Sequence, residues 1–221
     1  MIVIFEKRVP LSPQIMDTIK KYFPAISDEQ LVLLEQFHQH ILQWNENINV
    51  ISRKDTEEMI VKHILHSLAI AKLVSFTEGT KILDIGTGGG FPGIPLAILF
   101  PECEFHLIDS TGKKITVVNA FVKKYGLQNV VAEKIRAEEV ENKYDFIVSR
   151  AVMAMPKFIP LAKGKIRKGQ QNSLRNGIIA LKGGDLTEEL AEIKKTIQLF
   201  NISDWFSEPF FETKKIVYIK M

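Results

Sequence analysis

A glycine-rich stretch that follows a short apolar run constrains the fold of this 221-residue chain more than any other feature. Residues 82–85 read as a buried strand, and residues 86–93 contain five glycines. A strand-to-helix turn alone needs fewer, and the surplus lets the backbone approach a ligand closely. The free N–H groups at the start of the following helix would face that ligand. The stretch therefore predicts a nucleotide-like cofactor site.

From Lys81 onward, short apolar runs alternate with helical segments, which is typical of parallel strands joined by crossover helices. A helix is expected over residues 113–125, with Gly126 as its C-cap, and a charged helix from about Thr187 to Leu199. The expected strands cover residues 82–85, 105–109, 130–135, 145–149, 178–181 and 216–219. This order predicts an α/β, Rossmann-like sheet domain over residues 76–221.

Residues 1–75 are instead expected to form an N-terminal helical subdomain. A first helix is predicted between Ser12 and Pro24, because serine is a favoured N-cap and proline ends a helix. A second begins at Ser27, which has capping-box spacing to the glutamine three residues later, and its apolar stripe continues to Ile48. A third is expected to begin near Asp55.

Composition excludes several classes of protein. The chain is 46% hydrophobic and 25% charged, which is typical of globular proteins, and no apolar run approaches the roughly 20 residues that span a bilayer. Residues 1–5 are apolar but precede charged residues, the wrong order for a secretory signal, so we expect a cytoplasmic protein without a membrane span. The lone Cys103 excludes an internal disulfide and a cysteine-based metal site.

The net charge of +3 hides an uneven distribution. Residues 151–184 contain seven lysines and arginines and no acidic residue. Within them, residues 163–175 have the composition of a loop, which we call the basic loop. It is either a solvated charged loop or a phosphate-contacting one. We expect phosphate contacts, since the loop precedes a strand whose carboxyl end should face the cofactor.

Two acidic residues bear on the choice of cofactor. Asp84 lies on the strand before the glycines, where a carboxylate would attract a ligand ammonium group and repel the pyrophosphate of a dinucleotide. That favours S-adenosylmethionine. The spacing of Gly88, Gly90 and Gly93, with Asp109 at the end of the next strand, also satisfies the dinucleotide fingerprint. An NAD(P)-dependent oxidoreductase therefore remains an alternative.

The sequence around the glycines, Asp-Ile-Gly-Thr-Gly-Gly-Gly-Phe-Pro-Gly-Ile-Pro from Asp84 to Pro95, resembles the signature loop of a known family. This is the glucose-inhibited division protein B family, the 16S ribosomal RNA guanine-N7 methyltransferases. The similarity continues through Asp109-Ser110 with Lys113-Lys114, Ala137-Glu138-Glu139 and Ser149-Arg150-Ala151, and upstream through Trp44-Asn45 with Asn49.

The resemblance implies a class I S-adenosylmethionine-dependent methyltransferase fold. It also implies methyl transfer to nitrogen-7 of a guanine, with 16S ribosomal RNA or the small ribosomal subunit as the partner. No stable protein partner is expected. Nitrogen-7 already carries an unprotonated lone pair, so the absence of an obvious catalytic base is compatible with this reaction.

The expected cofactor site gathers residues at the carboxyl ends of the predicted strands, where an open α/β sheet binds its ligand. Its members are Asp84, Gly86, Gly88, Phe91, Asp109, Ser110, Ala137, Glu138 and Arg150. Asp109 and Ser110 are expected beside the ribose, by similarity to methyltransferases generally. Arg150 is also the candidate catalytic residue. Its guanidinium cannot act as a base, so we expect it to position the cofactor, a phosphate or the target base; a structural ion pair is its alternative role.

Two further groups of residues lie upstream. His63 and His66 are spaced to share a helix face, but no third ligand follows, so we expect surface or interface polarity and no metal site. Members of the family usually carry an acid where this chain has His66. Trp44 is expected to pack in the core, whereas Asn45 and its neighbour Asn49 either contact RNA or brace the catalytic domain.

Besides the oxidoreductase, two other functions stay open on the sequence alone. One is a methyltransferase that acts on another substrate. The other is a non-catalytic RNA-binding assembly factor that kept the fold.

Overall fold

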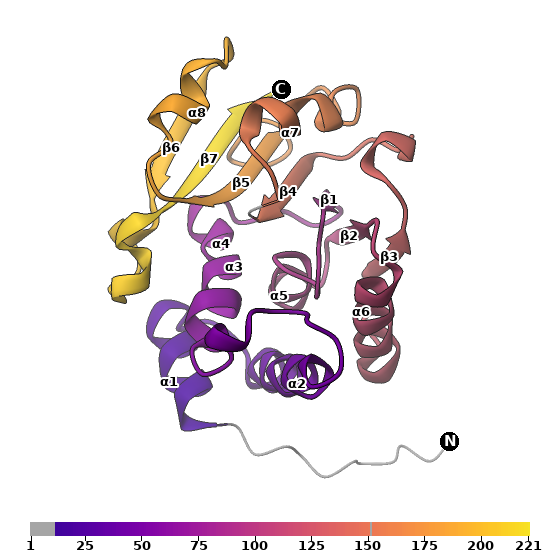
Figure 1. Ribbon diagram of the computed structural model, residues 1–221, viewed down its shortest axis with the longest axis vertical. Helices are drawn as coiled ribbons and strands as arrows, with labels where there is room; N and C mark the ends of the chain where they lie inside the picture. The colour runs from indigo at the N-terminus through magenta and orange to yellow at the C-terminus, as the bar shows by residue number, and fades with distance from the viewer. Residues whose placement is uncertain (1–11, 151) are drawn as a thin grey trace.

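The computed structural model describes residues 12–150 and 152–221, which form a seven-stranded sheet with helices on both faces (Figure 1). Residues 1–8, on which the expectation about a secretory signal depends, and Ala151 lie outside the described residues. The strand order is β3-β2-β1-β4-β5-β7-β6. The strands are β1 Lys81–Ile85, β2 Glu104–Asp109, β3 Val130–Lys134, β4 Phe146–Arg150, β5 Gly177–Gly183, β6 Ile197–Asn201 and β7 Lys214–Lys220.

All six predicted strands are confirmed, with ends shifted by one or two residues. β1 to β5 are parallel, whereas β7 runs antiparallel to both β5 and β6. The central strands are apolar throughout because both of their faces are covered. In β4, for example, Phe146 and Val148 enter the hydrophobic cluster on one face and Ile147 enters the cluster on the other.

The helices form layers around this sheet (Figure 1). They are α1 Pro13–Tyr22, α2 Asp28–Asn45, α3 His66–Leu68, α4 Ile70–Leu73, α5 Gly93–Leu99, α6 Gly112–Tyr125, α7 Met155–Ala162 and α8 Thr187–Ala191. Shorter turns are η1 Arg53–Asp55, η2 Ile60–Leu65, η3 Ala137–Glu139, η4 Ile202–Asp204 and η5 Pro209–Thr213. α5 and α6 cover the same face as the N-terminal helices, and α7 covers the opposite face. None of the described helices has the length and apolar character needed to cross a bilayer.

The N-terminal helices begin where the sequence predicts. The Ser12 hydroxyl accepts a hydrogen bond from the Ile15 N–H, and Ser27 and Gln30 form the expected capping box. α2 then packs across α5 and α6, so that Phe37 contacts the rings of Phe91 and Phe121 at centroid distances of 5.0 Å. The helices therefore share one hydrophobic cluster with the sheet. The boundary between residues 1–75 and 76–221 stays a prediction.

Two predicted elements differ from the structure. The third helix does not begin near Asp55, because Ser52 caps the separate short turn η1 and the Asp55 carboxylate pairs with Lys62 at 3.1 Å. The helical segment begins instead at Ile60, with a π-helical turn that continues to Leu65. The predicted helix from Thr187 to Leu199 ends at Ala191.

Residues 197–199, the end of this predicted helix, instead belong to the edge strand β6. There Ile197 pairs with Ile219 of β7, and Ile197 and Phe200 pack on opposite faces of the sheet. This alternating, non-local pairing outweighs the local helical pattern.

Candidate cofactor and substrate site

A cavity of about 500 Å³ opens at the carboxyl ends of β1, β2 and β4. β1 pairs with β2 on one side and with β4 on the other, so the chain crosses over in opposite directions at this point, where open α/β sheets bind ligands. Eight of the nine predicted site residues line the cavity; Asp84 does not. The lining residues are Val50, Ile85, Gly86, Thr87, Gly88, Gly89, Phe91, Ile108, Asp109, Ser110, Thr111, Lys114, Ile135, Arg136, Ala137, Glu138, Arg150, Val152, Met153 and Leu161.

The loop from Gly86 to Phe91 needs glycine for two reasons. Gly86 has a φ of 72°, a left-handed conformation that residues with a Cβ rarely adopt. Gly89 lies against the N-terminal helical layer, where an added Cβ would stand 2.1 Å from Cγ1 of Val50. The loop thus turns tightly while remaining in contact with residues far away in the sequence.

Asp84 lies beneath this loop rather than in the cavity. Its side chain is completely buried, and one carboxylate oxygen accepts hydrogen bonds from the Thr87 hydroxyl at 2.6 Å and the Gly93 N–H at 2.9 Å. Burial raises the pKa of Asp84 to about 7, against the lowering effect of these two bonds. A direct contact with a ligand ammonium group therefore has no support in this geometry. The carboxylate instead connects the two ends of the loop.

Asp109, the last residue of β2, ties the loop to the neighbouring strand. Its carboxylate accepts hydrogen bonds from the Gly88 N–H at 3.0 Å and from the Thr111 N–H at 2.8 Å. The second bond is an Asx-type turn to the backbone two residues on and lies just before α6, whose N-cap is Thr111. Because Asp109 and Ser110 also line the cavity, the same carboxylate is available to a hydroxyl group of a ligand.

Arg150, the last residue of β4, lines the cavity next to Phe91. Its guanidinium carbon lies 4.6 Å from the centre of the Phe91 ring, and Nη1 donates to the Lys62 carbonyl at 3.4 Å. Burial lowers its pKa to about 10, so the group remains charged at neutral pH. No described carboxylate lies within ion-pair distance of it. A partly buried cation without an ion-pair partner favours a ligand that brings negative charge or a carbonyl oxygen.

His63 and His66 were expected to supply surface or interface polarity; His66 is instead buried, and His63 is largely covered, with 12% of its side chain exposed. The π-helical turn directs His63 onto Phe91, with ring centroids 5.3 Å apart, and His66 packs on Phe210 and Phe211 of η5. Burial and the nearby Arg150 charge lower the pKa of His63 to about 3 and that of His66 well below its usual value. Within the described ranges, no cluster of three or more His, Cys, Asp or Glu side chains has the arrangement of a metal site.

Asn45 braces the segment that follows α2. Its buried side-chain oxygen accepts hydrogen bonds from the N–H groups of Val50 at 2.8 Å and Ile51 at 3.0 Å. Val50 in turn contacts Gly89 and lines the cavity. Of the two roles considered for Asn45, bracing is therefore the one with contacts in the structure. Trp44 is only partly buried, at the border of the hydrophobic cluster.

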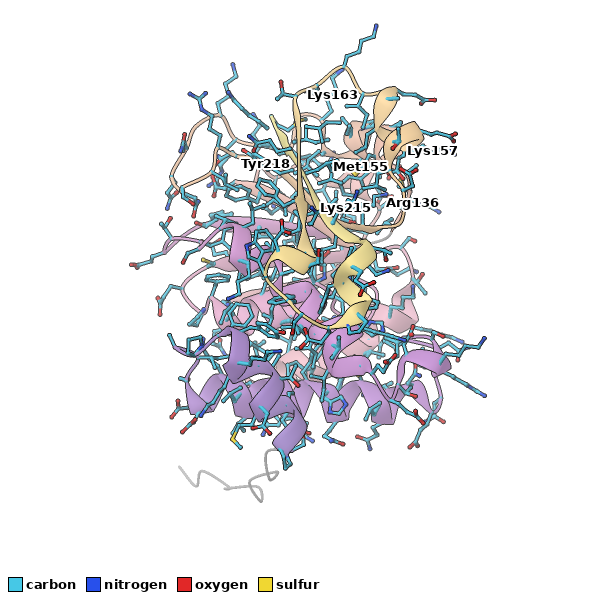
Figure 2. All side chains as sticks on the ribbon, turned by 90° about the vertical axis from the view of Figure 1, so that its left-hand side faces the viewer. Arg136, Met155, Lys157, Lys163, Lys215 and Tyr218 are labelled. Carbon is cyan, nitrogen blue, oxygen red and sulfur yellow. The ribbon has the colours of Figure 1, made fainter. Side chains whose placement is uncertain are left out.

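The basic loop lies at the amino ends of the parallel strands, whereas the cavity lies at their carboxyl ends. Arg167 pairs with Asp145, which precedes β4, and Asn172 bonds to Thr77 and Thr80, which precede β1. In Figure 2, Lys163 lies at the upper end of the molecule, away from Arg136, which lines the cavity. The loop does not stand beside the cavity, because a loop that precedes a parallel strand lies at the amino end of the sheet; its phosphate contacts stay a prediction.

Several lining residues were not singled out from the sequence. Thr87 is part of the glycine stretch, and Arg136, Val152 and Met153 directly follow strands β3 and β4. Applying the carboxyl-end rule to every strand would have found these four. Val50 carries no such signal, since only the packing of the N-terminal layer brings it to the cavity.

Comparisons with known proteins agree with this geometry. Ribosomal RNA small subunit methyltransferase G of Christiangramia forsetii is 53% identical over 206 residues, which cover 93% of this chain and 97% of that protein. The protein of the same name from Flavobacterium psychrophilum is 54% identical over 93% of this chain and 98% of its own length. Among solved structures, a SAM-dependent methyltransferase from Aquifex aeolicus superposes with a TM-score of 0.51 at 18% identity, covering 69% of this chain and 88% of that one.

The structural likeness confirms the predicted Rossmann-like methyltransferase fold, and the sequence matches confirm the predicted family. A model of the GidB family, described as rRNA small subunit methyltransferase G, matches residues 30–216. The chain belongs to this family of ribosomal RNA methyltransferases.

Proposed function

We propose that the protein transfers a methyl group from S-adenosylmethionine to nitrogen-7 of a guanine in 16S ribosomal RNA. The observation that carries this proposal is the cavity at the switch point of the sheet, which the glycine loop and Arg150 both line. Membership of the family supports ribosomal RNA as the substrate class. Such a substrate also supports the expected cytoplasmic location.

The residues present fit this cofactor. The cavity volume of about 500 Å³ lies within the range of roughly 300–1,000 Å³ that small-molecule sites occupy. Asp109 and Ser110 would hold the ribose hydroxyls, and Ala137 and Glu138 border the same side of the cavity. The backbone of Gly86 would face the amino-acid portion. Bound there, S-adenosylmethionine supplies a methyl group activated by its sulfonium sulfur.

The chain's own contribution is alignment and the exclusion of water. Guanine nitrogen-7 needs no deprotonation, so no residue has to act as a general base. Val50, Phe91, Val152 and Met153 give the cavity apolar walls, which keep water from the reacting atoms and limit the positions of the base. Arg150, held against Phe91, is suited to fix a carboxylate, a phosphate or a base carbonyl by paired hydrogen bonds.

The substrate enters as an unpaired base, since proteins usually read folded RNA through splayed loop nucleotides and overall shape. We therefore propose that one guanine is taken into the cavity while the surrounding RNA stays outside. Small subunits and naked 16S ribosomal RNA are both candidate forms of the substrate.

Incubation with labelled S-adenosylmethionine tests this function. The acceptors are small subunits and naked 16S ribosomal RNA from a strain that lacks the gene. We expect label in at least one of them, and strand cleavage at the methylated position after borohydride and aniline treatment, which is specific for guanine methylated at nitrogen-7. Label without this cleavage would exclude nitrogen-7, and absence of label from both acceptors would reject the function.

Calorimetry separates the proposal from the dinucleotide alternative. S-adenosylhomocysteine should bind to the protein, whereas NAD should not. Binding of NAD alone would favour the oxidoreductase, and binding of S-adenosylhomocysteine without any methylation of RNA would favour a non-catalytic protein or another substrate.

A further inference from the structure

Residues 49–54, which we call the rim segment, lie beside the mouth of the cavity. Val50 lines both the cavity and a neighbouring recess formed by residues 49–53. Two hydrogen bonds to the buried Asn45 side chain and direct contact with Gly89 fix the segment relative to the glycine loop. A group bound by the rim segment is therefore held at a defined position next to the cofactor.

The rim segment presents polar and cationic side chains to solvent. Asn49, Ser52, Arg53 and Lys54 are all exposed, and neither cation forms an ion pair with a described residue. Lys62 pairs with both Asp55 and Glu58, and its single charge offsets only one of these two acids. Three cations (Arg53, Lys54 and Lys62) and three acids (Asp55, Glu57 and Glu58) therefore balance over residues 53–62, and Arg53 and Lys54 are the cations there without an ion pair to a described residue.

The rim segment meets the cavity at Val50. Val50 lies on the wall with Phe91 and Arg150, whereas Lys114 and Arg136 follow β2 and β3 on the ribose side. Lys114, Arg136 and Arg150 therefore line the cavity itself, and Arg53 lines the recess next to it that shares Val50. A nucleotide whose base enters the cavity is flanked by a backbone phosphate on each side along its own strand.

We propose that the rim segment binds backbone phosphates of the RNA next to the target base, with Arg53 and Lys54 as the contacting residues. The inference takes the identity of the partner, ribosomal RNA, from the proposed function. Arginine and lysine bind phosphate oxygens through charge-assisted hydrogen bonds, and such contacts position the RNA without reading its sequence. The basic loop, at the amino ends of the parallel strands, cannot make contacts next to the target base.

The test compares two double variants that remove the same charge from the carboxyl and the amino ends of the parallel strands. Arg53→Gln with Lys54→Gln alters the rim segment, and Lys163→Gln with Lys168→Gln alters exposed cations of the basic loop. The affinity of each protein for naked 16S ribosomal RNA is measured by filter binding over a range of salt concentrations, in the presence of S-adenosylhomocysteine. Affinity for S-adenosylhomocysteine is measured separately by calorimetry.

We expect the rim variant to bind RNA at least about tenfold more weakly at low salt, with unchanged affinity for S-adenosylhomocysteine. The slope of log affinity against log salt should become shallower by about 0.7–0.9 for each lost contact. The basic-loop variant should keep the wild-type slope. Equal losses in both variants, or a rim variant that binds like wild type, would overturn the proposal.

Because filter binding requires no turnover, it also separates this inference from the proposed function. A wild-type protein that binds RNA through the rim segment but never methylates it would leave the inference standing and reject the methyl transfer. A wild-type protein that binds neither naked 16S ribosomal RNA nor small subunits would reject both.

Discussion

Asp84 acts on the cavity without lining it. One carboxylate oxygen holds the Thr87 hydroxyl and the Gly93 N–H, and so fixes the shape of the glycine loop from below. Asp84→Ala would leave the buried Gly93 N–H without a partner, at a cost of about 1–3 kcal/mol. We expect a drop of about tenfold or more in affinity for S-adenosylhomocysteine, since about 1.4 kcal/mol corresponds to a factor of ten.

Asp84→Asn is the matched control, because an amide oxygen still accepts both hydrogen bonds while the charge is lost. Calorimetry at pH 8 should place its affinity within about threefold of wild type, or roughly 0.7 kcal/mol. If the asparagine and alanine variants are equally weak, the charge itself contacts the ligand and the bracing role is wrong. Circular dichroism shows whether each variant is folded.

The glycine loop and the N-terminal helical layer behave as one element. A Cβ at Gly89 would stand 2.1 Å from Cγ1 of Val50 but 3.6 Å from its Cβ. Gly89→Ala should therefore displace the loop or the rim segment, with a typical overpacking cost of about 1–3 kcal/mol. Urea unfolding should show this loss of stability, and affinity for S-adenosylhomocysteine should fall with it.

Val50→Ala offers the rescue, because it removes the methyl groups that collide and keeps the Cβ at an ordinary contact distance. The double variant Gly89→Ala with Val50→Ala should be more stable than Gly89→Ala alone. Additive losses in the double variant would show that the two elements do not touch in solution, and the rim segment would lose its fixed relation to the loop.

At the scale of the whole molecule, burial makes stability depend on pH. His63 has its pKa lowered to about 3, and the pKa of His66 is also well below its usual value, so both are neutral when folded at pH 5 to 6.5. In the unfolded chain they bind protons below about pH 6.5. Stability is therefore full above pH 6.5 and falls as the pH drops, by about 1.4 kcal/mol per pH unit for each histidine.

His40 adds to this trend, since burial lowers its pKa too. Asp84 opposes it, because a pKa raised to about 7 makes the folded state retain a proton that the unfolded state loses. Urea unfolding at pH 7.5, 6.5, 5.5 and 5.0 measures the sum. His66→Gln should reduce the loss below pH 6.5 by about 1.4 kcal/mol per pH unit. Parallel profiles for variant and wild type would contradict a buried, neutral His66.

Much of the cavity could be predicted because its residues follow local rules. Glycines after a strand and acids at strand ends, such as Gly86 and Asp109, occupy positions that the order of strands and helices already defines. Asp84 shows the limit of this reasoning. Its place before the loop was evident, but whether its carboxylate points into the cavity or under the loop depends on which neighbours offer N–H and hydroxyl groups.

The sequence by itself determined which segments form the parallel strands, the capping of the first helices, the glycine loop and the family. Each depends on residues close together along the chain. Only the tertiary structure decided that residues 197–201 form an edge strand, that the basic loop lies away from the cavity and that Val50 reaches the glycine loop. These outcomes depend on pairing and packing between distant segments, whose free energy no local pattern contains.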